Sequence, residues 1–248
     1  MAAMRVLSDE NILRIWENGL HQHPVARAMT MLAQVFPELS ASELEALSVG
    51  QRDACLLSLR KRSYGSQFAG FGSCPQCQAH LEFSFDAAAV EIGYAPFEEV
   101  GQVHSLQVDD YVVQIRLPSS ADQLAMVRCG TVAEARKLLL SRSIVRVERD
   151  GEEIALNALP ETIIEGSGEY ILQRDPQSEV NIDLTCPACE QRWMAALEVG
   201  VFLWQEIQAH AKRVMREVHM LAMTYGWRET DILAMSAARR QYYLEMVT

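Results

Sequence analysis

Two short stretches, Cys74-Pro75-Gln76-Cys77 and Cys186-Pro187-Ala188-Cys189, carry the strongest structural signal in this chain. In each stretch, the two-residue spacing lets both sulfurs point to one side of a tight turn, and the proline pre-sets the backbone dihedral there. Two such knuckles that face each other form the tetrahedral thiolate cage that zinc prefers. The spacing therefore predicts one shared zinc site. Its predicted ligands are Cys74, Cys77, Cys186 and Cys189.

Both knuckles lie in strand-like sequence. Apolar and polar residues alternate over residues 81–86 after the first knuckle, and over residues 180–185 and 193–199 around the second. This is the period of a half-buried strand. A zinc ribbon places each knuckle at the tip of a hairpin, so the pattern predicts two ribbon halves, residues 71–92 and 178–200. The alternative, in which the four cysteines are reduced and buried without a metal, is disfavoured by the matched motifs.

Other uses of a Cys-x-x-Cys motif fit less well. A redox dithiol needs an exposed thiolate of low pKa at a helix N-terminus, whereas strand patterns follow both motifs here. A catalytic zinc keeps one position open for water and normally recruits His or Glu. His80 is the one nearby candidate, but four thiolates already complete the tetrahedron. We therefore expect a closed, structural site, and we expect the remaining cysteines, Cys55 and Cys129, in the core.

The composition argues against a protein that mainly binds nucleic acid. The 248 residues include 22 Lys and Arg against 33 Asp and Glu, a net charge of −11. Such an acidic chain is poorly suited to a phosphate backbone. The start of the sequence does not resemble a signal peptide, and no apolar run approaches the roughly 18 residues of a membrane span. The sequence predicts a soluble protein of a reducing, cytoplasmic compartment.

Residues 1–70 are predicted to form a helical region. Ser8 and Pro24 mark helix starts, and Ser42 and Ser48 are each followed three residues later by Glu or Gln, which is capping-box spacing. The helix after Ser48 ends in Arg60-Lys61-Arg62. Basic residues suit the negative end of a helix, so we interpret this trio as a solvated helix end rather than a binding patch.

Residues 93–177 form an insertion between the ribbon halves and mix strand and helix signals. Asp109-Asp110 and Arg149-Asp150-Gly151 are predicted hairpin turns, and Asp-Gly is a strong signal of this kind. Gly166 and Gly168 weaken the last predicted helix of the insertion. The predicted helices begin at Ala121, span Thr131 to Leu140, and span Pro160 to Gln173, and the predicted strands after the first hairpin cover Ile144 to Val147 and Ile154 to Leu156.

Residues 201–248 return to helix. One apolar stripe runs from Leu203 to Tyr225 with helical spacing, Gly226 ends it, and a short helical turn is predicted over residues 231–235. Ser236 can cap a final helix. The stripe is either a core face or a partner face, and core is favoured because amphipathic helices normally pack on their own domain. The predicted fold is thus α+β, with helical ends around a zinc ribbon that carries a mixed α/β insertion.

Motifs of enzymatic chemistry are absent from the sequence. It contains no phosphate loop, dinucleotide fingerprint, Gly-x-Ser-x-Gly elbow or His-Glu-x-x-His motif. His210 and His219 are nine residues apart on one predicted helix, too far around its axis to share a face. The sequence therefore predicts a protein without catalytic activity.

Several stretches in and around the knuckles form a distinctive combination. They include Leu47-Ser48-Val49-Gly50-Gln51-Arg52-Asp53, Leu117-Pro118-Ser119-Ser120-Ala121-Asp122, Phe202-Leu203-Trp204-Gln205-Glu206, and residues 56–60, 64–65, 81–83, 183–189, 225–233 and 236–243. Together they resemble the T-even-type phage baseplate family, whose members are known as baseplate hub assembly chaperones and are also encoded in contractile injection systems. Gly166-Ser167-Gly168 departs from the uninterrupted helix that the resemblance leads us to expect.

The resemblance implies a non-enzymatic assembly chaperone or structural component of the baseplate or hub of a contractile tail. The implied partners are baseplate or hub proteins, met in the bacterial cytoplasm during assembly, and the chain either leaves or stays in the tail particle. A zinc-ribbon nucleic-acid-binding regulator and a thiol oxidoreductase are the alternatives from other classes.

The C-terminal unit from Phe202 to Tyr243 is the expected docking surface, because it concentrates aromatic residues of the kind enriched at interface anchors. The alternative is that these rings only pack the helices on one another. The aromatic residues concerned are Trp204, Trp227, Tyr242 and Tyr243.

Overall fold

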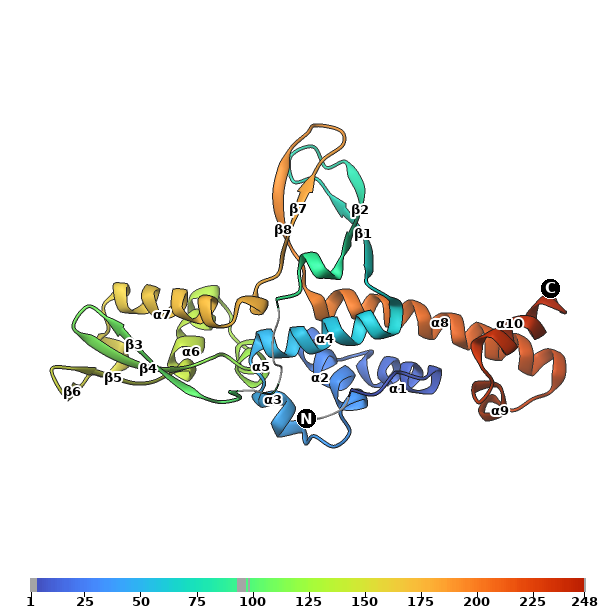
Figure 1. The fold of residues 1–248 in the computed structure, drawn as a ribbon, viewed down its shortest axis with the longest axis horizontal. Helices are drawn as coiled ribbons and strands as arrows, with labels where there is room; N and C mark the ends of the chain where they lie inside the picture. The colour runs from blue at the N-terminus through green and yellow to red at the C-terminus, as the bar shows by residue number, and fades with distance from the viewer. Residues whose placement is uncertain (1–3, 93–96, 98, 248) are drawn as a thin grey trace.

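The computed structural model describes residues 4–92, 97 and 99–247. The protein is α+β, with helices at both ends and small antiparallel sheets between them, as predicted. Two hairpins project from one side of a helical body, the insertion lies at one end of the body, and the C-terminal helices extend from the other (Figure 1). The helical body consists of α1 (Asp9–Gly19), α2 (Pro24–Val35), α3 (Ala41–Ala46), α4 (Val49–Tyr64) and α8 (Val199–Tyr225). The C-terminal arm consists of the end of α8 together with α9 (Glu229–Leu233) and α10 (Ala237–Glu245).

Serine capping boxes start three of the N-terminal helices. Ser8 and Ser48 cap α1 and α4 as predicted. The third box uses Ser40, whose Oγ accepts from the Glu43 N–H at 3.3 Å while the Glu43 carboxylate accepts from the Ser40 N–H at 2.8 Å. The prediction of a box at Ser42 was wrong, because two overlapping serine pairs share the same spacing and only one lies where the chain enters the helix.

The main core joins the N-terminal helices to α8 and to both hairpins. The apolar stripe of α8 faces this core, so the preference for a core face is confirmed over most of its length. Burial of aliphatic side chains of this kind contributes about 1.5–3 kcal/mol each. Fully buried members include Ile15, Met31, Leu32, Leu56, Leu57, Leu59, Leu203 and Ile207.

Arg60 belongs to this core region rather than to a solvated helix end. It is only 3% exposed, its guanidinium lies 2.7 Å from the Glu206 carboxylate of α8, and it stacks 3.9 Å from the Phe68 ring centroid. The interpretation of the basic trio was therefore wrong for Arg60. The Glu206 carboxylate, which lies far away in the sequence, compensates the buried charge of Arg60.

The insertion has its own small core. Its sheet is antiparallel in the order β3-β4-β5-β6, and α7 packs against β3 and β4. Both predicted hairpin turns are present, with positive φ at Asp109 and Asp150. The predicted strand from Ile154 to Leu156 was wrong, because the ladder ends at Glu153. The elements are β3 (Val103–Val108), β4 (Tyr111–Arg116), α5 (Ser120–Met126), α6 (Val132–Ser143), β5 (Ile144–Arg149), β6 (Glu152–Glu153) and α7 (Glu161–Arg174).

Helix α7 runs without interruption through Gly166 and Gly168. A Cβ on Gly166 would lie 3.3 Å from both Cγ atoms of Val108 on β3. The missing side chain at Gly166 therefore lets the helix pack closely on the sheet, which is why this glycine does not mark a break.

Asp175 joins the insertion to the body. Its carboxylate accepts from Ser48 Oγ at 3.0 Å and from the Gly50 N–H at 2.9 Å, so a residue from the far end of the insertion caps the N-terminus of α4. The Val49 N–H donates to the Pro118 carbonyl at 3.0 Å. Residues 47–53 and 117–122, two of the stretches that carry the family resemblance, therefore lie side by side.

This cap predicts opposite effects for two glycine substitutions. A Cβ on Gly50 would overlap the Asp175 carboxylate, whereas a Cβ on Gly168 meets no heavy atom within 4 Å. Gly50→Ala should lower the free energy of unfolding by at least about 1–2 kcal/mol, because the cap must move. Gly168→Ala should raise it by about 0.5–1 kcal/mol. Urea unfolding of both variants checks this, and equal effects would contradict it.

Asp122 predicts a pH dependence of the stability of the insertion. Arg116 and Arg142 each lie 2.6 Å from its fully buried carboxylate. Burial alone would raise the pKa of Asp122, but hydrogen bonds from Arg116, the Ser119 N–H and Arg142 hold this pKa well below its usual range. The resulting stabilisation is complete above the unfolded pKa of about 3.9 and is lost as the pH falls through the folded pKa.

Asp122→Asn should therefore cost about 1.5–3 kcal/mol at pH 7, because two charge-assisted hydrogen bonds lose their charge. The difference between variant and unchanged chain should shrink steadily below about pH 4. Denaturant titrations at several pH values measure this. A difference that stays constant down to pH 2 would show that the asparagine acts through shape alone.

The C-terminal arm is held on α8 by a buried arginine. Gly226 ends α8 with φ +68°, as predicted, and α9 begins at Glu229, two residues before the predicted turn. Arg240 is 1% exposed and pairs with Asp9 of α1 and with Glu217 of α8. Among the described residues, we find no helix that combines the length and the apolar character needed to cross a bilayer.

Candidate metal centre

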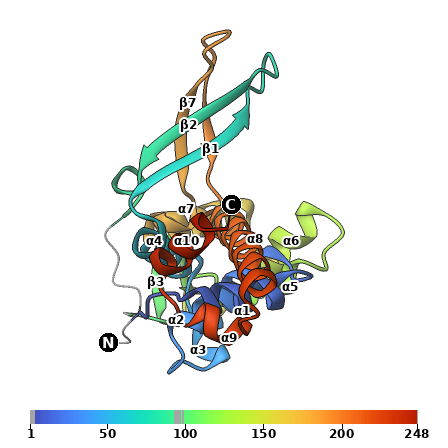
Figure 2. The ribbon, with the colours of Figure 1, turned by 90° about the vertical axis from the view of Figure 1, so that its right-hand side faces the viewer.

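Each hairpin carries one knuckle at its tip, and the two tips lie together away from the body in both views (Figures 1 and 2). The strands pair in antiparallel register, with Ser73 opposite His80 in the first hairpin and Thr185 opposite Arg192 in the second. The hairpin strands are β1 (Gln67–Ser73), β2 (His80–Asp86), β7 (Asn181–Thr185) and β8 (Arg192–Ala196).

The two knuckles adopt the same turn. In the first, the Gln78 N–H donates to the Cys74 carbonyl at 3.0 Å, and the Cys74 N–H donates to the Ala79 carbonyl at 2.9 Å. In the second, the equivalent bonds to and from Cys186 measure 3.0 and 2.8 Å. Gln78 and Glu190, which follow the second cysteine of each motif, share a φ of 59°. Two independent stretches thus present their sulfurs in equivalent frames.

The four predicted ligands come together. Sγ atoms of Cys74 and Cys189 lie 3.6 Å apart, as do those of Cys77 and Cys186, and all four lie within 4.8 Å of one another. A disulfide would require about 2.05 Å. A tetrahedral zinc site with bonds of about 2.3 Å has sulfur separations near 3.8 Å. The arrangement can therefore hold a metal ion, and its size fits zinc.

The environment of the cluster favours a thiolate at Cys186. Cys74 and Cys186 are fully buried, and the Ala188 N–H donates to Cys186 Sγ at 3.4 Å. Burial opposes ionisation, but hydrogen bonds from the Ala188 and Cys189 amides and from neighbouring thiols lower the pKa of Cys186 to about 7. Such amide donors stabilise the anionic form of a metal-binding sulfur.

The other candidate residues lie outside the cluster. His80 Nδ1 is 3.2 Å from Ser73 Oγ, on the strands below the tip. Cys55 is buried as predicted. Burial, and to a smaller extent the negative charge of nearby Asp53, raises the pKa of its thiol to about 12, so this thiol is unreactive. Cys129 is only half-buried. Its prediction as a core residue was wrong, because it lies just beyond the end of α5, where little packs over it.

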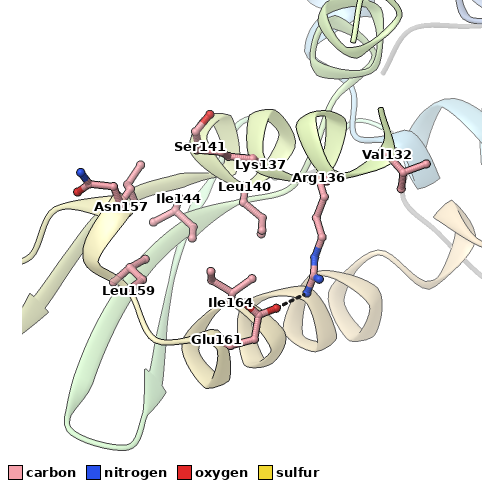
Figure 3. Close-up of a pocket in the computed structure, with 12 residues that line it drawn as sticks. Val132, Arg136, Lys137, Leu140, Ser141, Ile144, Asn157, Leu159, Glu161 and Ile164 are labelled. Carbon is pink, nitrogen blue, oxygen red and sulfur yellow. Dashed lines mark ion pairs between the residues drawn. The ribbon is translucent and has the colours of Figure 1, made fainter. Parts of the chain in front are cut away.

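A second concave site lies in the insertion between α6 and α7 (Figure 3). It has a volume of about 650 Å³ and a largely apolar lining that includes Leu140, Ile144 and Ile164. Arg136 and Glu161 form an ion pair of 3.2 Å between the two helices. No arrangement of nucleophile and base is apparent among its lining residues, and their chemistry is that of a packing or docking groove.

The C-terminal aromatic residues mostly pack against one another. Trp227 stacks on Tyr225 at 4.4 Å between ring centroids and meets Tyr243 edge-on at 4.9 Å. Trp204 is 6% exposed and lies under Arg27. Of the four rings considered as docking anchors, Tyr242 alone is largely exposed, at 62%. Aromatic content by itself does not make this arm an interface.

The knuckles, their strands and the junction at Asp175 all lie within a range of the chain that matches a known family. The family model for the T4 bacteriophage base plate protein matches residues 6–198. The chain belongs to this family. The matched range of this baseplate protein contains both knuckles and the whole insertion, whereas the C-terminal stretches that contributed to the resemblance lie beyond it. Comparisons with curated proteins and with solved structures gave no match.

Sequence reasoning missed two residues that organise this baseplate protein. In the sequence, Asp175 precedes Pro176 and indicates only the end of a helix, and nothing distinguishes Arg240 from its neighbour Arg239. A local signal existed for the first, since aspartate is a preferred helix-capping residue, but nothing in the sequence indicates which helix it caps.

Proposed function

We propose that this protein is a non-enzymatic assembly factor, or a structural component, of the baseplate or hub of a contractile tail. The observation that carries the proposal is the family match over residues 6–198, which spans the body, both hairpins and the insertion. The architecture supports it, because a rigid helical body with a projecting ribbon offers several faces to tail proteins (Figure 1).

We further propose that the four cysteines bind one structural Zn²⁺. All four candidate ligands are thiolates, which is the closed donor set of structural sites rather than the open set of catalytic ones. The metal would join hairpins whose strands form separate sheets. It would thereby fix the ribbon as a single rigid projection.

We also propose that the chain is divided into four units. They are the N-terminal helical region (residues 1–70), the two ribbon halves (71–92 and 178–200), the insertion (93–177) and the C-terminal helical region (201–248).

Deletion of the gene, followed by purification of tail particles, tests the assembly role. An assembly factor should be required for complete baseplates yet absent from mature particles, whereas a structural component should be recovered in them at a fixed ratio to other baseplate proteins. Normal numbers of complete particles without this chain would refute both forms of the proposal.

The nucleic-acid alternative is tested with the same purified protein. A regulatory zinc ribbon should bind duplex DNA with a steep salt dependence. We expect no such binding, because the net charge is −11.

A further inference from the structure

A groove between α8 and α10 is also lined by Tyr64, the last residue of α4. It has a volume of about 750 Å³. The groove lies where the C-terminal arm meets the helical body, and α10 packs against α8 there (Figure 1). Its apolar surface comes from both helices and from Tyr64. The apolar lining residues are Tyr64, Ala209, Met220 and Leu244.

The exposed charges that line the groove are positive, although the chain as a whole is acidic. Its two carboxylates are already held by buried arginines. Glu206 lies 2.7 Å from Arg60, and Glu217 lies 3.0 Å from Arg240. Arg240 is shared between Glu217 and Asp9. Both lining carboxylates are thus mostly buried and paired within the protein, so the charges that the groove presents to a partner are chiefly those of its exposed arginines.

Two lining arginines remain at the surface. The side chain of Arg213 is 63% exposed and lies 3.7 Å from Glu217, a carboxylate that Arg240 holds more closely. Arg216 is also exposed, and its Nε donates to the Lys212 carbonyl at 3.1 Å. An apolar floor with two exposed guanidinium groups at its rim is complementary to an apolar stripe flanked by carboxylates.

We propose that this groove binds an acidic amphipathic helix of another tail protein. Apolar residues of that helix would lie over Met220 and Leu244, and its Asp or Glu residues would pair with Arg213 and Arg216, in the manner of helix-in-groove recognition. The apolar floor favours a polypeptide over a nucleic acid, whose backbone requires several cations along a groove. This inference rests on the proposed role in tail assembly and names the chemistry of the partner.

The test uses two synthetic helical peptides with the same leucine stripe, one flanked by glutamates and the other by lysines. Fluorescence anisotropy with the full chain should show at least tenfold tighter binding of the glutamate peptide. Arg213→Glu combined with Arg216→Glu should weaken binding of the glutamate peptide at least tenfold, so that the protein then prefers the lysine peptide. Arg5→Glu combined with Arg128→Glu makes the same change of charge at exposed positions elsewhere and should leave both affinities within twofold.

A second variant tests the floor of the groove. Met220→Asp should weaken binding of the glutamate peptide at least tenfold. Circular dichroism should show an unchanged helix content, because Met220 is 39% exposed and is not part of the core. Equal binding of both peptides, equal loss in the control variant, tighter binding of a DNA oligonucleotide, or self-association of the chain through this groove would each overturn the proposal.

The particle assay separates this inference from the proposed function. If deletion of the gene prevents assembly and the Arg213→Glu, Arg216→Glu variant restores it fully, the assembly role stands and the groove is not the docking site. If deletion has no effect on particles, the assembly role fails and the docking proposal fails with it, whatever the peptides show.

Discussion

Replacing Cys186 with serine is expected to abolish stoichiometric metal binding and to free the two hairpins from each other. A serine hydroxyl stays protonated at neutral pH and cannot replace a thiolate ligand. The unchanged chain should contain about one zinc ion per molecule. Structural zinc sites in small domains contribute about 10–16 kcal/mol of apparent binding energy to folding. Metal analysis and hydrogen exchange over residues 67–86 and 181–196 measure both effects.

Two other cysteines provide matched controls for Cys186→Ser. Cys129→Ser alters a half-buried thiol outside the cluster and should retain the metal with little change in stability. Cys55→Ser places a hydroxyl in the core and should cost about 1–3 kcal/mol while retaining the metal. Folded, reduced protein that contains no metal, or a Cys186→Ser variant that retains it, would disprove the proposed site.

Reversing the charge of Arg240 should destabilise the protein by about 3–5 kcal/mol or more. Arg240→Glu would place a third carboxylate between Asp9 and Glu217 in a position that is 1% exposed. Removal of one partner from a buried ion pair has a cost of this size, and repulsion adds to it. The arm should detach from α1 and α8. Thermal unfolding and limited proteolysis near residues 226–236 report on this.

The neighbouring residue is a close control for Arg240→Glu. Arg239 is exposed, and its guanidinium lies 5.7 Å from the Tyr243 ring centroid. Arg239→Glu should therefore change the free energy of unfolding by less than about 1 kcal/mol. Similar losses in both variants would contradict the assignment of Arg240 as the residue that holds the arm. The pair also shows why Arg240 is unsuitable as a surface variant for docking experiments.

Local features of this protein were predictable from its sequence. Helix starts at Ser8, Pro24 and Ser48, the turn at Asp150-Gly151 and the helix end at Gly226 each depend on residues within a few positions of one another. Hydrogen bonds of caps and turns are made inside the segment, so the sequence contains all the atoms that decide them. Errors arose where two local solutions had the same spacing, as at Ser40 and Ser42.

The grouping of the four cysteines could be predicted from the sequence, although the two pairs are far apart in the chain. Each motif supplies only two of the four ligands of a tetrahedral site, so the matched pair predicted one common cluster. The four sulfurs do lie together. The uses of Arg60, Asp175 and Arg240 were not predictable, since each of these charges finds its partner in a distant segment. Whether a charge is solvated or buried depends on what packs over it, and only the tertiary structure decides that.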